Sequence, residues 1–306
     1  MRILFITSNR VGDAVLSTGL LDHLIGNYPQ SRITVVCGPY AEGVFARMPN
    51  RERTLVLEKK PWNMHWLPLW AWAAARRWDL VIDLRGSALG FTVRTGRRAV
   101  LRSRPSDATT PKVEQLARVL ALDPPPLPTA WISTEDHALA ASILPQERPV
   151  IGLGPTANWA PKAWAPDRFV TLFRMISARL LPGAVPTILA GPGEWEKRLA
   201  APVLAALPDA VDLTGRTTLP EAAACLARCA LFVGNDSGLM HLAAATKVPT
   251  LGLFGPTPVS QYAPAGIHAV AVHEGASMDD LSVDAAFQAA ERLLAPATPP
   301  VGELLD

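Results

Sequence analysis

Short apolar runs rich in β-branched residues alternate with longer stretches of helical periodicity along the first part of the chain. This alternation predicts buried parallel strands joined by helices that cover both faces of a sheet. The expected strands are Ile3–Thr7, Ile33–Cys37, Thr54–Leu57, Leu80–Leu84 and Ala99–Leu101. The expected helices are Ala14–Gly26, Ala41–Met48, His65–Arg77 and Lys112–Leu122.

A proline-rich segment, Asp123–Pro128, interrupts this pattern because its prolines can continue neither a helix nor a central strand. The pattern then restarts. The expected strands are Val150–Leu153, Val185–Ala190, Val211–Leu213, Leu231–Val233 and Thr250–Phe254, and the expected helices are Asp167–Leu181, Glu194–Leu207, Leu219–Arg228, Leu239–Ala245 and Val283–Leu294. We therefore expect an α/β protein with two Rossmann-like, doubly wound parallel-sheet domains facing a cleft, over residues 1–145 and 146–306. The proline-rich tail Pro296–Asp306 is expected to be loosely held.

Composition narrows the class of protein. The chain has 306 residues, of which 49% are hydrophobic, and this suffices for two cores. A net charge of only +2 argues against nucleic-acid binding through a basic surface. The apolar start of the chain is too short for a signal peptide, and no stretch approaches the ~20 apolar residues of a membrane span. Three cysteines fit a reducing compartment. We expect a soluble, cytoplasmic protein.

The segment Gly234–His241 follows an expected strand and opens a helix. Asp236 or Ser237 can cap that helix, and its free N–H groups form an anion site suited to a diphosphate. Gly238 lets a ligand approach the backbone, and His241 lies one turn into the helix, where it can donate to a phosphate or sugar oxygen. An ordinary capped helix with a half-buried histidine is about equally compatible with this pattern.

Two other loops follow strands of the second half. Thr156 offers a hydroxyl and Lys162 a point charge for phosphate, although a solvated lysine is the commoner case. Glu194 can accept hydrogen bonds from a ribose or a base, or it can cap a helix. Because the carboxyl ends of parallel strands meet at one sheet edge, these loops are expected to lie beside the Gly234–His241 turn.

In the first half, Asp13 lies at the start of a helix after the strand-turn Thr7–Gly12. It fits a helix N-cap, and it also fits a general base that takes a proton from an acceptor hydroxyl. The chain lacks the glycine fingerprint of dinucleotide sites, a Walker-type phosphate loop, an Asp-x-Asp metal motif and a His/carboxylate metal set. No metal site is therefore expected, and Lys, His and helix N-termini would balance the charge of a diphosphate.

The segment Pro61–Trp78 holds five of the nine tryptophans. Trp62, Trp66 and Trp70 share a helical stripe if the helix begins that early. They can pack on the sheet, or some can face a membrane interface or a lipid-linked acceptor, with Arg76 and Arg77 meeting anionic groups.

Two stretches resemble glycosyltransferase family 9, the heptosyltransferase family of lipopolysaccharide core synthesis. One runs from Arg2-Ile3-Leu4 to Val11-Gly12-Asp13. The other combines Asp212–Gly215, Gly234–Ala245 and Leu253–Thr257 in that order. The resemblance spans nearly the whole chain, with weaker matches at Asp79–Leu84 and Lys162–Trp164. It departs at Arg85-Gly86, where the family commonly has Gln-Gly, and in the tryptophan-rich region, where the family's basic acceptor-side residues find no counterpart.

This resemblance implies a GT-B fold and an inverting transfer without a metal or other cofactor, usually from ADP-heptose to a lipopolysaccharide-core or other envelope glycan acceptor. Asp13 matches the family's catalytic base and Lys162 its donor-phosphate lysine. The donor turn matches at Asp236, Ser237, Gly238 and His241, and Glu194 matches an acidic residue near the nucleoside. Arg10 and Arg85 are candidates for acceptor binding. The implied partners are a nucleotide sugar and a glycolipid or glycan, with peripheral contact at the inner membrane.

Three other functions are compatible with this fold class. They are a nucleotide-sugar epimerase, a non-catalytic sugar-nucleotide-binding relative and a dehydrogenase, of which the last lacks its glycine fingerprint.

Overall fold

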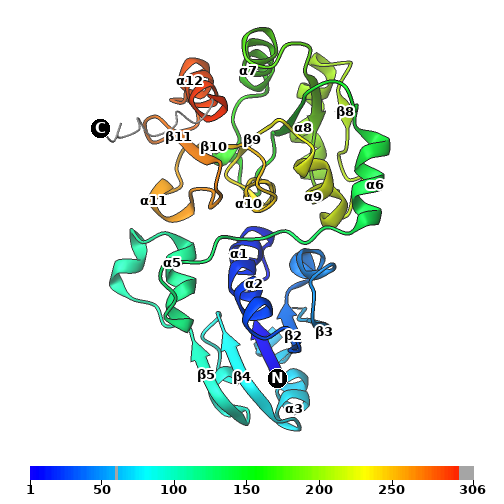
Figure 1. Cartoon of the computed structure of the whole chain (residues 1–306). Coiled ribbons are helices and arrows are strands. Elements are labelled where there is room, and N and C mark those ends of the chain that lie inside the picture. The colour runs from blue at the N-terminus through cyan, green and yellow to red at the C-terminus, as the bar shows by residue number, and fades with distance from the viewer. Residues whose placement is uncertain (59–60, 296–306) are drawn as a thin grey trace, which may run out of the picture.

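The computed structural model describes residues 1–58 and 61–295, and the tail Pro296–Asp306 lies outside the described residues. The chain forms two α/β domains stacked one above the other (Figure 1). The elements of the first domain are β1 (Arg2–Ile6), α1 (Val11–Leu16), α2 (Thr18–Asn27), β2 (Arg32–Cys37), η1 (Pro39–Phe45), β3 (Arg51–Val56), η2 (Pro61–Asn63), α3 (Trp66–Ala74), β4 (Trp78–Asp83), α4 (Leu89–Thr92) and β5 (Thr95–Val100).

A helical connection leads to the second domain. It contains η3 (Pro105–Ala108), α5 (Lys112–Ala117), η4 (Arg118–Leu120) and α6 (Thr134–Ile143). The second domain follows with β6 (Val150–Gly154), η5 (Ala160–Lys162), α7 (Pro166–Arg179), β7 (Val185–Ile188), α8 (Glu194–Ala206), β8 (Val211–Asp212), α9 (Leu219–Ala227), β9 (Leu231–Asn235), α10 (Gly238–Ala245), β10 (Thr250–Phe254), α11 (Val259–Tyr262), β11 (Ala269–His273) and α12 (Val283–Leu294).

Both sheets are parallel and doubly wound, which confirms the predicted fold class. The first has the order β3-β2-β1-β4-β5, and the second has the order β11-β10-β9-β6-β7-β8. In each sheet the chain reverses its direction of winding beside the first strand, between β1 and β4 and between β6 and β9. Ligands of such sheets bind beyond the carboxyl ends of the strands at these switch points. The loops after these four strands are therefore the natural place for a site.

The strand β1 shows how the first domain is layered. Ile3 and Phe5 pack on one face with α1 and α2, whereas Leu4 and Ile6 pack on the other face with α3 and α4. Alternate side chains of a strand point to opposite faces, so a continuous apolar run predicts burial on both sides. All four side chains are fully buried.

Several predicted helices are shorter than expected. The predicted helix Ala14–Gly26 is two helices that divide at Ser17, where the Ser17 hydroxyl bonds the Ala14 carbonyl and the Thr18 hydroxyl bonds that of Val15, each at 2.7 Å. Side-chain hydroxyls that take helix carbonyls bend or interrupt a helix. Similarly, Ala41–Met48 is replaced by the 3-10 segment η1, and the helix begun at Lys112 ends at Ala117.

The condition for a stripe of three tryptophans is not met. The helix α3 begins at Trp66, and Trp62 lies outside it with φ 55° in the left-handed region. Only Trp66 and Trp70 therefore share a helical face, and Trp62 is almost wholly exposed.

The edge strand β11 and the helix α6 are among the elements that were not expected from the sequence. The Ser133 hydroxyl accepts a hydrogen bond from the backbone N–H of Asp136, and the Asp136 carboxylate accepts one from the backbone N–H of Ser133. These two bonds form a capping box at the N-terminus of α6. The helix α6 packs on α9 of the second domain. We propose that the first domain ends in the proline-rich connection ahead of α6 rather than at residue 145.

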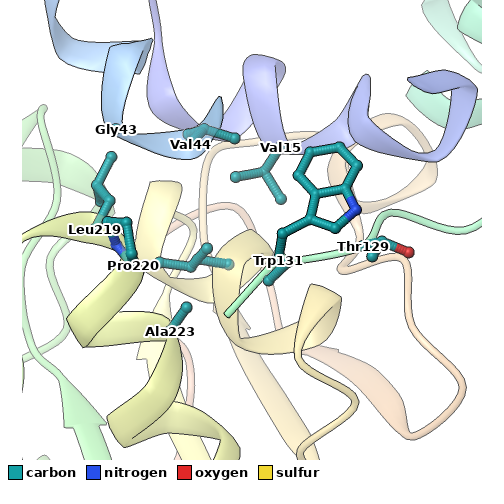
Figure 2. A pocket seen from close by; sticks show the side chains of 10 residues that line it. Val15, Gly43, Val44, Thr129, Trp131, Leu219, Pro220 and Ala223 are labelled. Atoms are coloured by element: carbon teal, nitrogen blue, oxygen red, sulfur yellow. The ribbon is translucent and has the colours of Figure 1, made fainter. Parts of the chain in front are cut away.

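Specific contacts join the two domains. The Arg47 guanidinium binds the buried Asp136 carboxylate through two hydrogen bonds of 2.8 and 2.9 Å. Arg47 holds the pKa of Asp136 far below its usual range. An apolar cavity of about 10 Å³ lies between α1, η1, α9 and the connection (Figure 2), with Val15, Val44, Trp131 and Leu219 in its wall. The cavity has room for about one water molecule and its lining is mainly apolar, so the two domains pack closely here.

Candidate active site

The loops after the switch-point strands carry most of the predicted site residues. Asp13 follows β1, Arg85 follows β4, Lys162 follows β6 and Asp236 follows β9. Each sheet therefore directs two of its loops toward the junction between the domains, beside α1 and α10 (Figure 1). A parallel strand order fixes this convergence, because all carboxyl ends lie on one edge.

Asp13 lies in the first turn of α1, but it does not cap that helix. The N-cap position is Arg10, and no side chain caps the helix there. The Asp13 Oδ2 atom instead accepts a hydrogen bond of 3.2 Å from the Ser8 hydroxyl. Of the two roles open from the sequence, the structure disfavours the cap and leaves the carboxylate partly exposed toward the second domain.

The turn after β9 contains several buried polar atoms. Within the described residues, Asn235 Nδ2, Ser237 Oγ and His241 Nδ1 have no hydrogen-bond partner. Ser237 occupies the N-cap position of α10, yet its side chain makes no capping bond. Buried polar groups are normally hydrogen-bonded, so three orphaned atoms at one helix N-terminus fit a ligand with polar oxygens.

Lys162 and Asp236, which lie in different loops, form an ion pair that the sequence of neither loop predicts. Lys162 Nζ lies 2.6 Å from Asp236 Oδ2, and the lysine side chain keeps 22% of its surface exposed. The pair links the turn after β6 to the turn after β9. Lys162 therefore lies at the predicted site, held by a buried carboxylate, with N–H groups left to face an anion.

Two glycines bring the domains into direct contact at this point. A Cβ atom on Gly12 would lie 2.9 Å from His241 Cδ2, and one on Gly238 would lie 2.9 Å from Val11 Cβ. Only glycine permits this approach, because either methyl group would require the neighbouring helix to shift. The N-termini of α1 and α10 thus meet, which sets the loop of Asp13 against the ring of His241.

The charges of both domains act on His241. Burial lowers the pKa of the imidazole, while the carboxylates of Asp236 and Asp13 oppose the shift and Lys162 adds to it. The ring is therefore neutral at neutral pH, with one nitrogen to donate and one to accept.

Tyr262 at the end of α11 was missed by the sequence analysis. Burial raises the pKa of its phenol, the Asp13 and Asp236 carboxylates raise it further, and Arg10 lowers it. These influences place the phenol within electrostatic range of residues from both domains. The only signal in the sequence was the small polar turn Gly255–Thr257 at the same sheet edge, which the tyrosine follows by five residues.

The remaining donor-side candidates, Thr156 and Glu194, differ in burial. Thr156 follows β6 and is buried, with 4% of its surface exposed. Glu194 is the first residue of α8 after the N-cap Gly193, and it pairs with Lys197 at 2.7 Å with most of its side chain exposed. Thr156 therefore lies buried in the chain between β6 and Lys162, whereas Glu194 lies on the surface after β7.

The two arginine candidates lie on the first domain. Arg10 is exposed at the start of α1. Arg85 donates to Asn9 Oδ1 at 3.0 Å, and its guanidinium lies 5.0 Å from the Trp66 ring centroid. Burial lowers the pKa of Arg85 and the nearby Asp83 carboxylate opposes this.

Among the described residues, no group of three or more His, Cys, Asp or Glu side chains is placed to hold a metal ion. No helix in residues 1–58 and 61–295 is both long and apolar enough to cross a membrane.

The glycosyltransferase family 9 (heptosyltransferase) model matches residues 98–287, which is more than half of the chain. The chain belongs to glycosyltransferase family 9. It is 27% identical over 313 residues to the lipooligosaccharide heptosyltransferase 2 of Haemophilus influenzae, covering 86% of each chain. The predicted family and the assignment as a glycosyltransferase are confirmed.

Solved structures support the fold of this family 9 protein. The ADP-heptose lipopolysaccharide heptosyltransferase II of E. coli matches with a TM-score of 0.76 at 22% identity, covering 96% of this chain and 98% of the other. A family 9 glycosyltransferase of Veillonella parvula matches with a TM-score of 0.79 at 21% identity, covering 96% and 97%. The two-domain architecture is the GT-B fold.

The buried imidazole predicts a pH dependence of stability in this family 9 chain. Because the pKa of His241 is lower in the folded state than in the unfolded state, the unfolded state binds more protons as pH falls below about 6.5. Stability from neutral His241 is fully present above that value and is lost as pH falls through the folded-state pKa. His241→Gln is expected to flatten the acid slope of the unfolding free energy, by up to about 1.4 kcal/mol per pH unit.

The measurement is urea unfolding between neutral pH and pH about 5. His137→Gln, at an exposed position of α6, is the matched control and should keep the wild-type slope. An unchanged slope in His241→Gln would mean that the ring does not titrate abnormally.

Proposed function

We propose that this protein is an inverting, metal-independent glycosyltransferase that moves heptose from ADP-heptose to an acceptor of the lipopolysaccharide core. Family membership and the names of the relatives support the sugar and the acceptor class. The observation that carries the mechanism is the meeting of Asp13 with the Asp236–His241 turn across the domain junction.

The second domain would hold the donor. The N-terminus of α10, the ammonium of Lys162 and the orphaned Ser237 hydroxyl are groups that stabilise a diphosphate as it gains charge on leaving. Neutral His241 would donate to a phosphate or sugar oxygen, while buried Thr156 and the exposed Glu194 would contact the donor from the strands beside it. Because these groups are fixed before the reaction, they cost little reorganisation in the transition state.

The first domain would hold the acceptor. Asp13 would remove the proton of the attacking hydroxyl, and the Ser8 hydrogen bond would orient its carboxylate so that one oxygen faces the sugar. The acceptor would attack the anomeric carbon from the side opposite the leaving diphosphate, which inverts the configuration. Arg10 and Arg85 would bind anionic groups of a glycolipid presented at the cytoplasmic face of the inner membrane.

The test incubates the protein with ADP-heptose and a lipopolysaccharide-core acceptor that lacks the heptose, without added metal and with a chelator. The expected result is a heptosylated acceptor whose new linkage is inverted, formed at the same rate with and without chelator. Loss of turnover in chelator would overturn metal independence.

Incubation with donor alone separates transfer from epimerisation. The epimerase considered from the sequence predicts an altered sugar nucleotide without any acceptor, whereas the transferase predicts unchanged donor with slow hydrolysis at most. A chain that binds ADP-heptose but yields neither product would be a non-catalytic relative.

A further inference from the structure

The helix α3 has an apolar face without a partner in the described part of the chain. It contains only tryptophan, leucine, proline and alanine, and one side of it, with Leu69 and Ala73, packs on the first sheet. Away from these two residues, Leu67 is 56% exposed and Trp70 is 45% exposed. A helix that is apolar on all sides is normally buried on all sides. The exposed apolar face of α3 therefore indicates a contact with a partner or a membrane.

Neighbouring segments add further exposed apolar side chains. Trp70 Nε1 donates to Thr92 Oγ1 at 3.1 Å, which ties α3 to α4 and brings Phe91, 45% exposed, beside it. Trp62, 94% exposed, and Met64 precede α3. We call the side chains of Trp62, Met64, Leu67, Trp70 and Phe91 the α3 surface.

The segment of the chain that contains the α3 surface has a strongly one-sided charge. Residues 61–104 contain eight arginines against two aspartates, so the rest of the chain is net negative. The Asp83 carboxylate is fully buried, and the Asp79 carboxylate accepts from the backbone N–H of Arg2 at 2.7 Å. Within the described residues none of the eight arginines forms an ion pair, and they are Arg76, Arg77, Arg85, Arg94, Arg97, Arg98, Arg102 and Arg104.

Three of these arginines follow α3 and α4 closely in the chain, and three of the eight lie against aromatic rings of the same segment. Arg76 and Arg77 follow α3 and Arg94 follows α4. The Arg76 guanidinium lies 4.0 Å from the Trp72 ring centroid, and that of Arg102 lies 5.9 Å from the Phe91 ring centroid. The arrangement is an aromatic and aliphatic centre with a cationic border.

We propose that the α3 surface, with its arginine border, docks on an anionic lipid bilayer. Tryptophan, leucine and phenylalanine would enter the boundary between headgroups and acyl chains, while the arginines would bind lipid phosphates. A second copy of the chain is a poor occupant, because a symmetric contact would bring two borders of unpaired arginines together. The proposal deepens the peripheral membrane contact given above. Its test measures membrane binding rather than turnover, so membrane docking and the proposed glycosyl transfer can each fail independently.

A chain of side-chain contacts connects α3 to the loop that carries Asp13. Trp66, the first residue of α3, lies under the Arg85 guanidinium, and Arg85 donates to Asn9 in the turn that precedes Asp13. The bilayer would therefore hold a lipid-linked acceptor at the domain whose loop carries Asp13.

The experiment is co-sedimentation of the full chain with vesicles of phosphatidylglycerol and phosphatidylcholine, and with vesicles of phosphatidylcholine alone. The wild-type chain is expected to bind the anionic vesicles, to release them at high salt, and to bind neutral vesicles weakly. Trp62→Asn/Leu67→Ser should lower partitioning at least about tenfold, and asparagine tolerates the left-handed backbone at position 62. Arg77→Glu should lower partitioning about tenfold.

Matched controls come from the second domain. Ile267→Ser removes an apolar side chain that is 62% exposed, and Arg292→Glu reverses an exposed charge at the end of α12. Both should partition like wild type, and thermal unfolding should show that all four variants are folded. Equal binding to both vesicle types, or an equal loss in the variants and the controls, would overturn the proposal. So would a dimer in sedimentation velocity that Leu67→Ser dissociates.

Discussion

Replacing Asp13 with asparagine is expected to lower kcat by about 10²–10⁴-fold, the usual contribution of a general base. The amide keeps the shape of the carboxylate and can still accept from the Ser8 hydroxyl, but it cannot take a proton. Affinity for ADP should stay unchanged, since the groups proposed to bind the diphosphate belong to the second domain. Steady-state kinetics with ADP-heptose and acceptor, together with calorimetric titration of ADP, measure both quantities.

Asp22→Asn is the matched control for this experiment. Asp22 is an exposed residue of α2, so the same loss of charge occurs on the same domain away from the junction. Its kcat should equal that of wild type. If Asp13→Asn retains kcat within about threefold, less than a general base supplies, the proton acceptor is a group other than Asp13. Tyr262 is a poor substitute, because its raised pKa keeps the phenol protonated.

Lys162→Met is expected to weaken ADP binding by about 10–100-fold, the range of a charge-assisted hydrogen bond to an anion. Methionine keeps the length of the side chain while removing the ammonium that lies 2.6 Å from Asp236. The change also leaves the Asp236 carboxylate without its cation, so the unfolding temperature should fall as well. Titration below that temperature separates the two effects.

Two further variants distinguish a phosphate-binding lysine from one that only neutralises Asp236. In Lys162→Met/Asp236→Asn the carboxylate charge is gone, so recovery of ADP affinity would show that Lys162 acts through Asp236 alone. We expect no recovery. Lys197→Met is the matched control, because Lys197 forms a pair of similar length with Glu194 on the surface, at 48% and 82% exposure. Exposed pairs contribute little, so its stability should equal that of wild type.

The positions of Asp13, Lys162 and Asp236 were predictable because each follows an apolar run that reads as a parallel strand. Strand order needed no detailed prediction for this purpose, since parallel strands place all their carboxyl ends on one edge. The pairing of Lys162 with Asp236 was not predictable in the same way, because 74 residues separate them and nothing local specifies which loops touch. Tyr262 was missed for the same reason.

Helix boundaries were predicted less well than strands. Hydrophobic periodicity continues through Ser17, but the hydroxyls of Ser17 and Thr18 take helix carbonyls and divide the helix there. The helix α6 has weak periodicity, and its packing on α9 and the Arg47–Asp136 bridge hold it in place. Whether Trp62 lies on a helical stripe or in an exposed turn likewise depended on where α3 begins.

The sequence by itself determined the two doubly wound sheets, the loops that we propose carry the chemistry, and the family. These follow from short-range patterns and from motifs of consecutive residues. Only the tertiary structure decided that Gly12 and Gly238 bring two helix N-termini together, that Asp13 is free of a capping role, and that one face of α3 is exposed. Each of these depends on contacts between residues far apart in the chain. Side-chain size, burial and charge settle such contacts only once both domains are folded.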